Sequence, residues 1–159
     1  MTINELSDLT ARDLMSRGVV AVPEMISLRR AARRLLDARV SGAPVVDEAG
    51  CCTGVLSSTD FMRWVEKEDD RPMERCVCSD FLPEWHLESL DAVPTDAVRT
   101  SMTSDPVTAL PEARIGALAR IMLDAHVHRV IIVDEARRPV GIVSSTDLLA
   151  AMARMDAGT

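Results

Sequence analysis

The pattern of apolar and polar positions predicts the same series of elements twice along the chain. Apolar residues recur at three- and four-residue spacing in two stretches, which indicates one helix in each. A short β-prone run precedes each helix, and two apolar strands joined by a turn follow it. The helical stretches are 28–36 and 115–123, and the strand runs are 19–22, 44–46, 54–56, 107–110, 130–133 and 141–143.

An internal repeat accounts for this twofold pattern. Shifting the chain by 87 positions aligns residues 12–60 with residues 99–147 without a gap, and 18 of the 49 pairs are identical. Chance would produce only a few identities in an overlay of that length. The protein is therefore a duplicated unit with an unrelated middle segment.

Each repeat ends on the sequence Ser-Ser-Thr-Asp, at 57–60 and at 144–147, where the last strand runs into a helix. We expect these helices to begin near Asp60 and Asp147, with Thr59/Asp60 and Thr146/Asp147 as N-caps. The same groups also suit a ligand. A helix N-terminus favours anions such as phosphate, and an aspartate can accept two hydrogen bonds from the vicinal hydroxyls of a sugar. Capping and ligand binding are both compatible with the motif.

One β-α-β-β-α unit cannot close a core alone, so the two copies are expected to pack together as an α+β fold. The predicted boundaries are 8–70 for the first repeat, 71–96 for an irregular connecting insert and 97–155 for the second repeat. The insert has no counterpart in either repeat. The four aromatic residues of the chain all lie from the end of the first repeat into this insert, at Phe61, Trp64, Phe81 and Trp85.

The charge balance argues against a nucleic-acid partner. The chain has 25 acidic and 18 basic side chains, a net charge of −7 and a pI near 4.9, whereas a nucleic-acid binder normally has a basic footprint. No apolar run approaches the ~18 residues that a membrane span needs. The first ten residues lack the apolar core of a secretory signal, so we expect a cytoplasmic protein with reduced thiols.

Catalytic and metal chemistry have little support in the sequence. None of the common phosphate-loop, dinucleotide, nucleophile-elbow or zinc-protease motifs is present, and no nucleophile with a base and an orienting group can be assembled. Cys51 and Cys52 lie in a predicted turn without a nearby histidine. Cys76 and Cys78 with His86 could form a thiol metal site or a redox sensor, although structural zinc sites usually have two to four residues between cysteines.

The two motif sets resemble a known module. Residues 40–47 with 54–60 resemble a CBS domain, named after cystathionine β-synthase, and residues 128–135 with 141–147 resemble a second one. The resemblance implies a Bateman module, in which two CBS repeats pack about a pseudo-twofold axis and often pair again into a flat homodimer. Such modules bind adenosine-containing ligands (AMP, ADP, ATP or S-adenosylmethionine) in clefts between the repeats.

The resemblance also implies which residues bind the ligand. Asp60 and Asp147 match the aspartate that binds ribose, and the hydroxyls beside them match groups that reach ribose or phosphate. The segment before the central hairpin matches the base- and phosphate-binding positions. The complete set is Ser41, Gly42, Ala43, Ser57, Thr59, Asp60, His128, Arg129, Val130, Ser144, Thr146 and Asp147.

The two predicted pockets differ in chemistry. Ser41–Ala43 are expected to face Asp147, while His128–Val130 are expected to face Asp60. His128-Arg129 resembles the phosphate-binding pair of the kinase gamma subunits that sense AMP, and arginine binds phosphate bidentately. The first repeat has Ser41-Gly42 at these positions, so the pockets should be unequal.

Several functions remain open on this basis. The leading hypothesis is a non-catalytic sensor that binds an adenine nucleotide and acts on a separate effector protein. A ligand-free dimerisation or docking platform is the alternative, and the apolar residues around Phe81 and Trp85 favour it. The arginines of the first helix, at 29, 30, 33 and 34, are expected to form a solvated face rather than a phosphate site.

Overall fold

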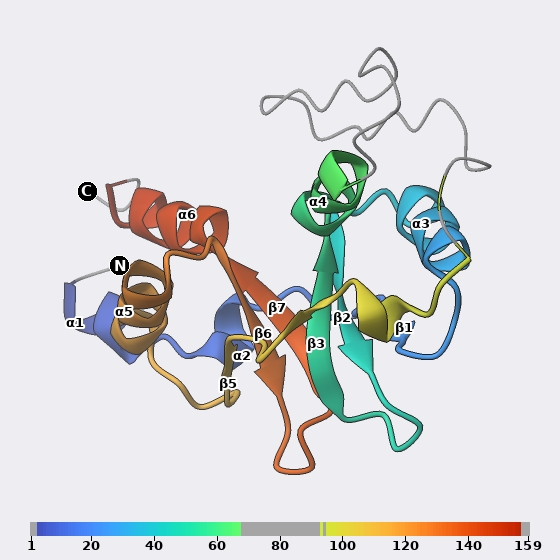
Figure 1. Ribbon diagram of the computed structural model, residues 1–159. Coiled ribbons are helices and arrows are strands. Elements are labelled where there is room, and N and C mark those ends of the chain that lie inside the picture. Colours follow the sequence, from blue (N-terminus) through green and yellow to red (C-terminus); the bar gives the residue numbers. More distant parts are fainter. Residues whose placement is uncertain (1–2, 68–92, 94, 157–159) are drawn as a thin grey trace. The chain divides into compact units, whose positions relative to one another are not determined.

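Two separate β-sheets with helices packed against them form the framework of the protein. The computed structural model describes residues 3–67, 93 and 95–156. Residues up to Val19 and those from Pro106 onward form one unit, and Val20–Asp105 form the other. Each unit has its own sheet and its own hydrophobic core (Figure 1).

The unit of Val20–Asp105 contains a four-stranded sheet in the order β1-β2-β3-β4. Strand β1 is parallel to β2, whereas β3 is antiparallel to both of its neighbours. Its elements are β1 (Val22–Pro23), α3 (Leu28–Asp37), β2 (Gly42–Val46), β3 (Cys52–Ser57), α4 (Ser58–Lys67), the 3-10 helix η2 (Val98–Thr100) and β4 (Thr103–Ser104).

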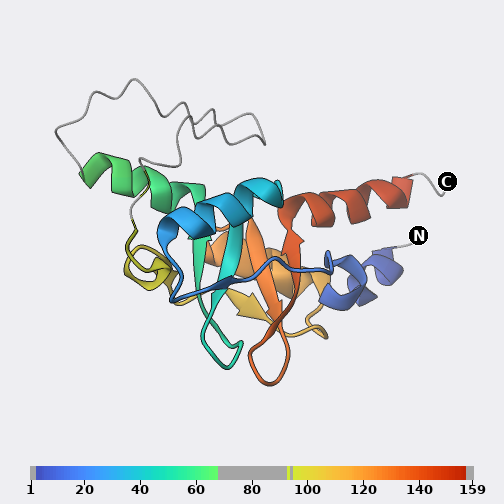
Figure 2. The same cartoon turned by 90° about the vertical axis from the view of Figure 1, so that its right-hand side faces the viewer.

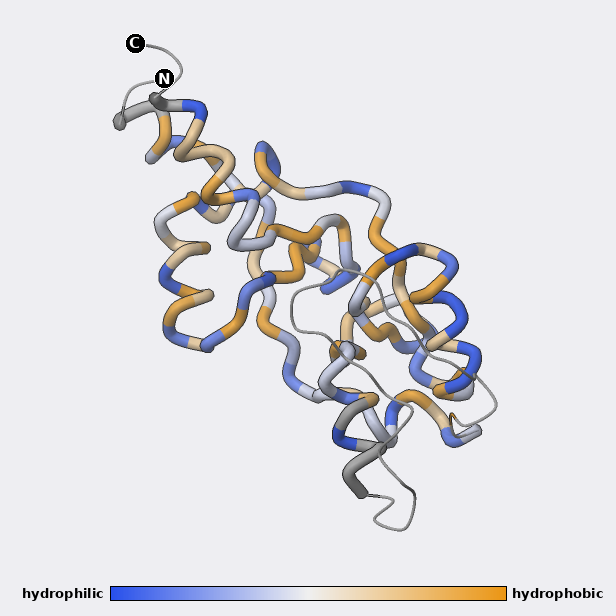
Figure 3. Tube along the Cα trace, turned by 90° about the horizontal axis from the view of Figure 1, so that it is seen from above, coloured by the Kyte–Doolittle hydropathy of each residue, from blue (hydrophilic) through white to orange (hydrophobic). Residues whose placement is uncertain are grey.

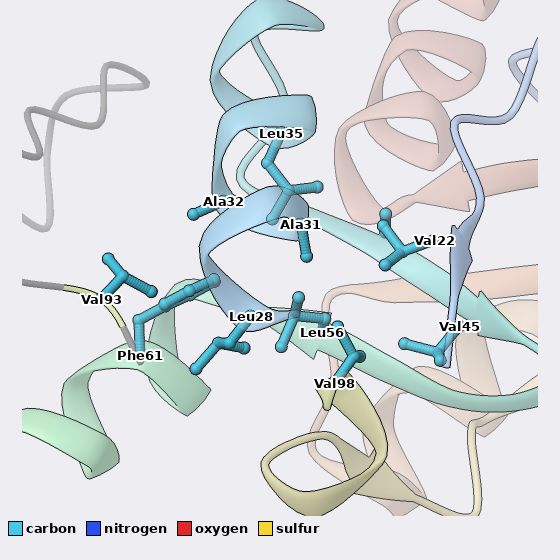
Figure 4. Packing of buried hydrophobic residues seen from close by; sticks show 11 residues of the cluster. Val22, Leu28, Ala31, Ala32, Leu35, Val45, Leu56, Phe61, Val93 and Val98 are labelled. Atoms are coloured by element: carbon cyan, nitrogen blue, oxygen red, sulfur yellow. The ribbon is translucent and has the colours of Figure 1, made fainter. Parts of the chain in front are cut away.

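Helix α3 shows why this sequence forms an amphipathic helix. Ser27 caps it, because its hydroxyl accepts a hydrogen bond from the Arg30 amide at 3.3 Å. Its apolar residues face the core with Leu56 (Figure 4), and along its backbone hydrophilic positions alternate with hydrophobic ones (Figure 3). Three of the four arginines are exposed, and the fourth, Arg29, donates to the Val93 carbonyl at 3.1 Å. The expected solvated face is confirmed.

The second unit repeats this architecture with a three-stranded sheet in the order β5-β6-β7. Its core contains Leu118, Ile132 and Val143, all fully buried. Its elements are α1 (Ile3–Asp8), α2 (Ala11–Leu14), β5 (Thr108–Ala109), α5 (Ile115–Ala125), β6 (Arg129–Val133), β7 (Pro139–Ser144) and α6 (Ser145–Asp156).

The duplication extends to backbone detail. Val22 pairs with Val45 in one sheet, and Ala109 pairs with Ile132 in the other, both at the offset of 87. Both hairpins have an irregularity at the same place, between Val45 and Val46 and between Ile132 and Val133. The residues of positive φ also form pairs at this offset: Gly18 with Asp105, Arg39 with His126, and Gly50 with Arg137. The expected α+β fold with two repeats is confirmed.

The segment before each repeat packs in the other repeat's unit. Residues 103–104 form β4 beside β3 of the first repeat, while Ser16 forms a bridge with Ile142 of the second. The compact units therefore cut across the predicted divisions 8–70 and 97–155, since residues 8–19 lie with the second repeat. The boundaries of the sequence repeats therefore differ from the boundaries of the compact units.

A glycine in each repeat permits this docking. A Cβ at Gly54 would lie 2.7 Å from both the Thr103 carbonyl oxygen and the Met102 sulfur, well inside contact distance. A Cβ at Gly141 would collide with the Met15 side chain. Only glycine lets the incoming segment come this close to the strand.

Two predictions about element boundaries were wrong in detail. The first strands, expected at 19–22 and 107–110, have only two residues each, because only those residues pair with the neighbouring strand. The helices after the second strands begin at Ser58 and Ser145, two residues before the aspartates.

Candidate functional site

The two Ser-Ser-Thr-Asp sequences lie at the junctions of β3 with α4 and of β7 with α6. Each hairpin turn lies at the far end of its strands from this junction (Figure 2). Both junctions therefore combine a strand end, a helix N-terminus and a short run of hydroxyl and carboxylate side chains.

Each junction is organised by hydrogen bonds between its first serine and its aspartate. In the first repeat, Asp60 Oδ2 accepts from the Ser57 amide at 2.7 Å and from the Ser57 hydroxyl at 2.9 Å. In the second, Asp147 Oδ2 accepts from the Ser144 amide at 2.7 Å and from the Ser144 hydroxyl at 2.6 Å. The aspartate reaching back to the N-cap amide is the capping-box arrangement. The expectation of caps at Thr59/Asp60 and Thr146/Asp147 was wrong: the serines precede the helices, and both threonines are exposed.

The start of the preceding strand completes each junction. Gly42 pairs with Ser57, and the Ser58 amide donates to the Ser41 carbonyl at 3.1 Å. Arg129 likewise pairs with Ser144, and the Ser145 amide donates to the His128 carbonyl at 2.9 Å.

The structure therefore brings the predicted residues together in two sets, one in each unit. Most members of both sets are exposed or half-buried, so their polar groups are accessible. There are three exceptions: Ala43, with 2% exposure, and Val130, with none, have side chains that belong to the cores, and Asp60 is buried as well, with 4% exposure. The sets are Ser41, Gly42, Ala43, Ser57, Thr59 and Asp60 in one unit and His128, Arg129, Val130, Ser144, Thr146 and Asp147 in the other.

The two aspartates have different surroundings. Asp60 is only 4% exposed. Its second oxygen, Oδ1, accepts a hydrogen bond from the Thr103 hydroxyl at 2.8 Å and lies 3.9 Å from the Arg63 guanidinium. Asp147 is half-buried. Within the described residues, its hydrogen bonds all involve Ser144, which leaves Oδ1 without a partner.

Sequence reasoning missed Thr103 and Arg63 as partners of Asp60. The repeat alignment contains a partial signal, because it pairs Thr103 with another hydroxyl residue, Ser16. It also pairs Arg63 with Ala150, beyond the last identical position. Only the structure shows that the hydroxyl of a distant segment reaches this carboxylate.

The predicted pairing of Ser41–Ala43 with Asp147, and of His128–Val130 with Asp60, depends on how the two repeats meet. It stays a prediction.

The other candidate chemistry finds no site in the part of the chain that the structure describes. No group of three or more histidine, cysteine or acidic side chains there could hold a metal ion. Cys51 is half-buried and Cys52 is buried, and neither forms a disulfide. The proposed metal or redox residues Cys76, Cys78 and His86 lie outside the described residues, as do Phe81 and Trp85. Among the described helices, none is long and apolar enough to cross a membrane.

A family model described as "CBS domain" matches residues 11–67 and 96–154. Two curated relatives match most of the chain. A homoserine O-acetyltransferase of Methanococcoides burtonii is 26% identical over 145 residues, which cover 91% of this chain and 24% of that protein. The 5'-AMP-activated protein kinase subunit gamma-3 of Homo sapiens is 27% identical over 157 residues, which cover 99% of this chain and 28% of that protein. The chain thus spans about a quarter of the length of these relatives.

Two solved structures share the fold. CBSX2, crystallised in complex with AMP, has a TM-score of 0.69 and 19% identity, with 92% of this chain and 98% of that chain covered. The CBS domain pair of protein MJ0100, in complex with 5'-methylthioadenosine and S-adenosyl-L-methionine, has a TM-score of 0.67 and 23% identity, covering 94% and 97%.

Proposed function

Because the chain belongs to the CBS-domain family, whose model matches it twice, we propose that it is a non-catalytic regulatory module for an adenosine-containing nucleotide. AMP is the first candidate, with ADP, ATP and S-adenosylmethionine as related ligands. The nucleotide would bind between the repeats and change how they, or two subunits of a cytoplasmic homodimer, are arranged. A separate effector protein would respond to that change.

The observation that carries this proposal is the repeated strand-to-helix junction. In both repeats it combines a helix N-terminus with a serine hydroxyl and an aspartate in the same geometry. Helix N-termini favour phosphate, and carboxylates accept hydrogen bonds from ribose hydroxyls. Two solved relatives of this fold hold AMP or adenosine derivatives, which supports the same ligand class here.

His128 and Arg129 are the proposed phosphate ligands. Both side chains are exposed at the start of β6, beside the N-terminus of α6. A guanidinium binds phosphate oxygens with two parallel hydrogen bonds, which a serine cannot imitate. Because the first repeat has Ser41 and Gly42 at these positions, we propose two unequal pockets, each completed by residues of both repeats. Asp147 would serve the Ser41–Ala43 pocket, and Asp60 the His128–Val130 pocket.

Calorimetric titration of the full chain with AMP, ADP, ATP and S-adenosylmethionine tests the proposal. We expect saturable binding of at least one of them. Arg129→Ala should weaken the phosphate-bearing ligands by about tenfold or more, because it removes a charge-assisted bidentate contact. Arg120→Ala is the matched control, since Arg120 is an exposed arginine of α5 outside the junction. Folded protein that binds none of the four ligands would refute the proposal.

A docking platform is the second candidate function, and one observation favours it. Leu123 of α5 and Leu149 and Met152 of α6 are 75%, 63% and 53% exposed, respectively. Leu149 and Met152 are three residues apart on α6 and therefore share one face of the helix, and exposed large apolar side chains that lie together are typical of interaction surfaces. Sedimentation of Leu149→Glu separates the candidates: loss of self-association with unchanged nucleotide binding would assign these residues to assembly alone.

A further inference from the structure

We propose that Asp60 is a structural tie for strand β4, which it holds through Thr103, and that Asp147 is the carboxylate open to the ribose. The assignment of Asp147 rests on the proposed nucleotide function, whereas the tie is a property of the folded chain. The consequence is that a ribose can bind Asp147 without rearrangement, whereas at Asp60 it must first displace Thr103.

The tie is visible in the hydrogen bonds of Asp60. Its Oδ2 atom holds the helix cap through Ser57, and its Oδ1 atom accepts from the Thr103 hydroxyl at 2.8 Å. The Arg63 guanidinium, 3.9 Å from the same Oδ1, adds a weak ion pair at the surface. Both carboxylate oxygens are thus in use, and the side chain is 2% exposed.

Thr103 joins elements that are far apart in the sequence. It lies on β4, which follows the insert and pairs with β3 at Val55. The Thr103–Asp60 bond therefore fastens this strand to the N-terminus of α4, and it adds to the backbone pairing between β3 and β4. A hydrogen bond to a charged group in a buried position contributes more than a neutral one.

The second repeat has the same backbone without the tie. Ser16 bridges to Ile142 at the position that corresponds to the Thr103–Val55 pairing. Its side chain is exposed, and the structure gives it no hydrogen bond to Asp147. Ala150, in place of Arg63, supplies no cation. Asp147 Oδ1 is consequently an accessible acceptor in the part of the chain that the structure describes.

This difference has a direct consequence for ribose binding. A vicinal diol donates to carboxylate oxygens that are exposed and not already hydrogen-bonded. At Asp147 this requires no rearrangement, whereas at Asp60 the ligand must first displace Thr103. Losing one hydrogen bond to a charged group corresponds to about ten- to hundredfold weaker binding. This effect opposes that of the phosphate ligands, because His128 and Arg129 are proposed for the pocket that Asp60 serves. The Thr103 hydrogen bond therefore offsets part of their contribution at that site.

A double-mutant cycle tests the tie without any ligand. Thermal unfolding is compared for the full chain, Thr103→Val, Asp60→Asn and the double variant. Thr103→Val alone should lower the unfolding midpoint by about 3–8 °C, and the double variant should lose less than the sum of the single variants. The matched cycle of Ser16→Ala with Asp147→Asn should be additive. Additive losses in the first cycle would overturn the tie. If Asp60→Asn is too unstable for the cycle, an unfolding midpoint of Thr103→Val equal to that of the parent chain would overturn it.

Titration with AMP tests the second half of the proposal. Asp147→Asn should remove one AMP site, and Thr103→Val should leave that site intact. Thr103→Val should also tighten the other site, served by Asp60, by about tenfold, because Asp60 Oδ1 is released. Unchanged affinity of the Asp60 site in Thr103→Val, or tightening of the Asp147 site instead, would overturn the assignment. No binding of any of the four ligands by any variant would instead refute the proposed function, and the unfolding cycle would still decide the tie.

Discussion

Replacing Gly54 by alanine probes the close approach of β3 and β4 more directly than any other single change. The new Cβ would lie 2.7 Å from the Thr103 carbonyl oxygen and 2.7 Å from the Met102 sulfur. Ordinary van der Waals contact begins at 3.4 Å. The backbone of β4 must therefore move away by about 0.7 Å, because the carbonyl oxygen, unlike the methionine tip, cannot rotate aside.

The expected loss of stability follows from this displacement. Overpacking of a tightly packed site costs about 1–3 kcal/mol, and a backbone contact places Gly54→Ala near the middle of that range. For a chain of this length, about 2 kcal/mol corresponds to a decrease of about 4–8 °C in the unfolding midpoint. Urea unfolding followed by circular dichroism measures the change as a lower transition midpoint.

Gly116→Ala is the matched control, because it adds the same methyl group elsewhere. Gly116 is an exposed residue of α5, and a Cβ there would meet nothing within 4 Å. Alanine is favoured over glycine in helices, and Gly116 lies in the first turn of α5, so this variant should be at least as stable as the parent chain. If Gly54→Ala were as stable as the parent while Gly116→Ala behaved as expected, the close approach of β3 and β4 would be refuted.

Three further changes test separate parts of the molecule by the same unfolding assay. Leu118→Ala should cost about 2–5 kcal/mol, because Leu118 is fully buried; a loss below 1 kcal/mol would contradict its place in the core. Arg137 has a left-handed φ of 61°, where the other repeat has Gly50, so Arg137→Gly should stabilise by up to about 1 kcal/mol and Gly50→Arg should destabilise. The hydrogen bond from the Thr10 side chain lowers the pKa of Asp13. The contribution of this carboxylate is therefore present above its unfolded pKa near 3.8 and is lost as the pH falls through the lower folded value. Asp13→Asn should consequently be less stable than the parent at pH 7, and the difference should shrink as the pH falls below 3.8; a difference that does not change with pH would contradict the hydrogen bonds from Thr10 to Asp13.

The repeat is the part of the fold that sequence reasoning predicts best. An overlay at 87 positions predicts two copies of one unit, and the structure has matching strand registers, irregularities and positive φ angles at this offset. These features could be predicted because they depend on interactions between residues that are close together in the sequence. Helical spacing in α3 and α5, and the aspartate turns of the two hairpins, depend on residues close together in the chain. In those turns Asp47 accepts from the Ala49 and Cys51 amides, and Asp134 from the Arg138 amide.

The helix caps show where pattern reasoning loses precision. Serine, threonine and aspartate are all acceptable N-caps, so a run containing all three does not specify which residue caps the helix. The choice depends on where the preceding strand ends. Ser57 and Ser144 still pair with Gly42 and Arg129, and the helices begin directly after them. Asp60 and Asp147 consequently become the third helical residues and reach back to the caps.

The order of residues along the chain determines its duplicated α+β design and the polar groups at each strand-to-helix junction. These features follow from periodicity and from contacts within a few residues. Only the tertiary structure shows that the segment before each repeat pairs with the other repeat's sheet. It also shows that the aspartates of the two identical Ser-Ser-Thr-Asp motifs have different hydrogen-bond partners. Asp60 is engaged by Thr103, which lies 43 residues away in the sequence, while Asp147 has no such partner among the described residues. A contact between residues so far apart produces no repeating pattern in the sequence, because it forms only when the folded chain brings β4 beside β3.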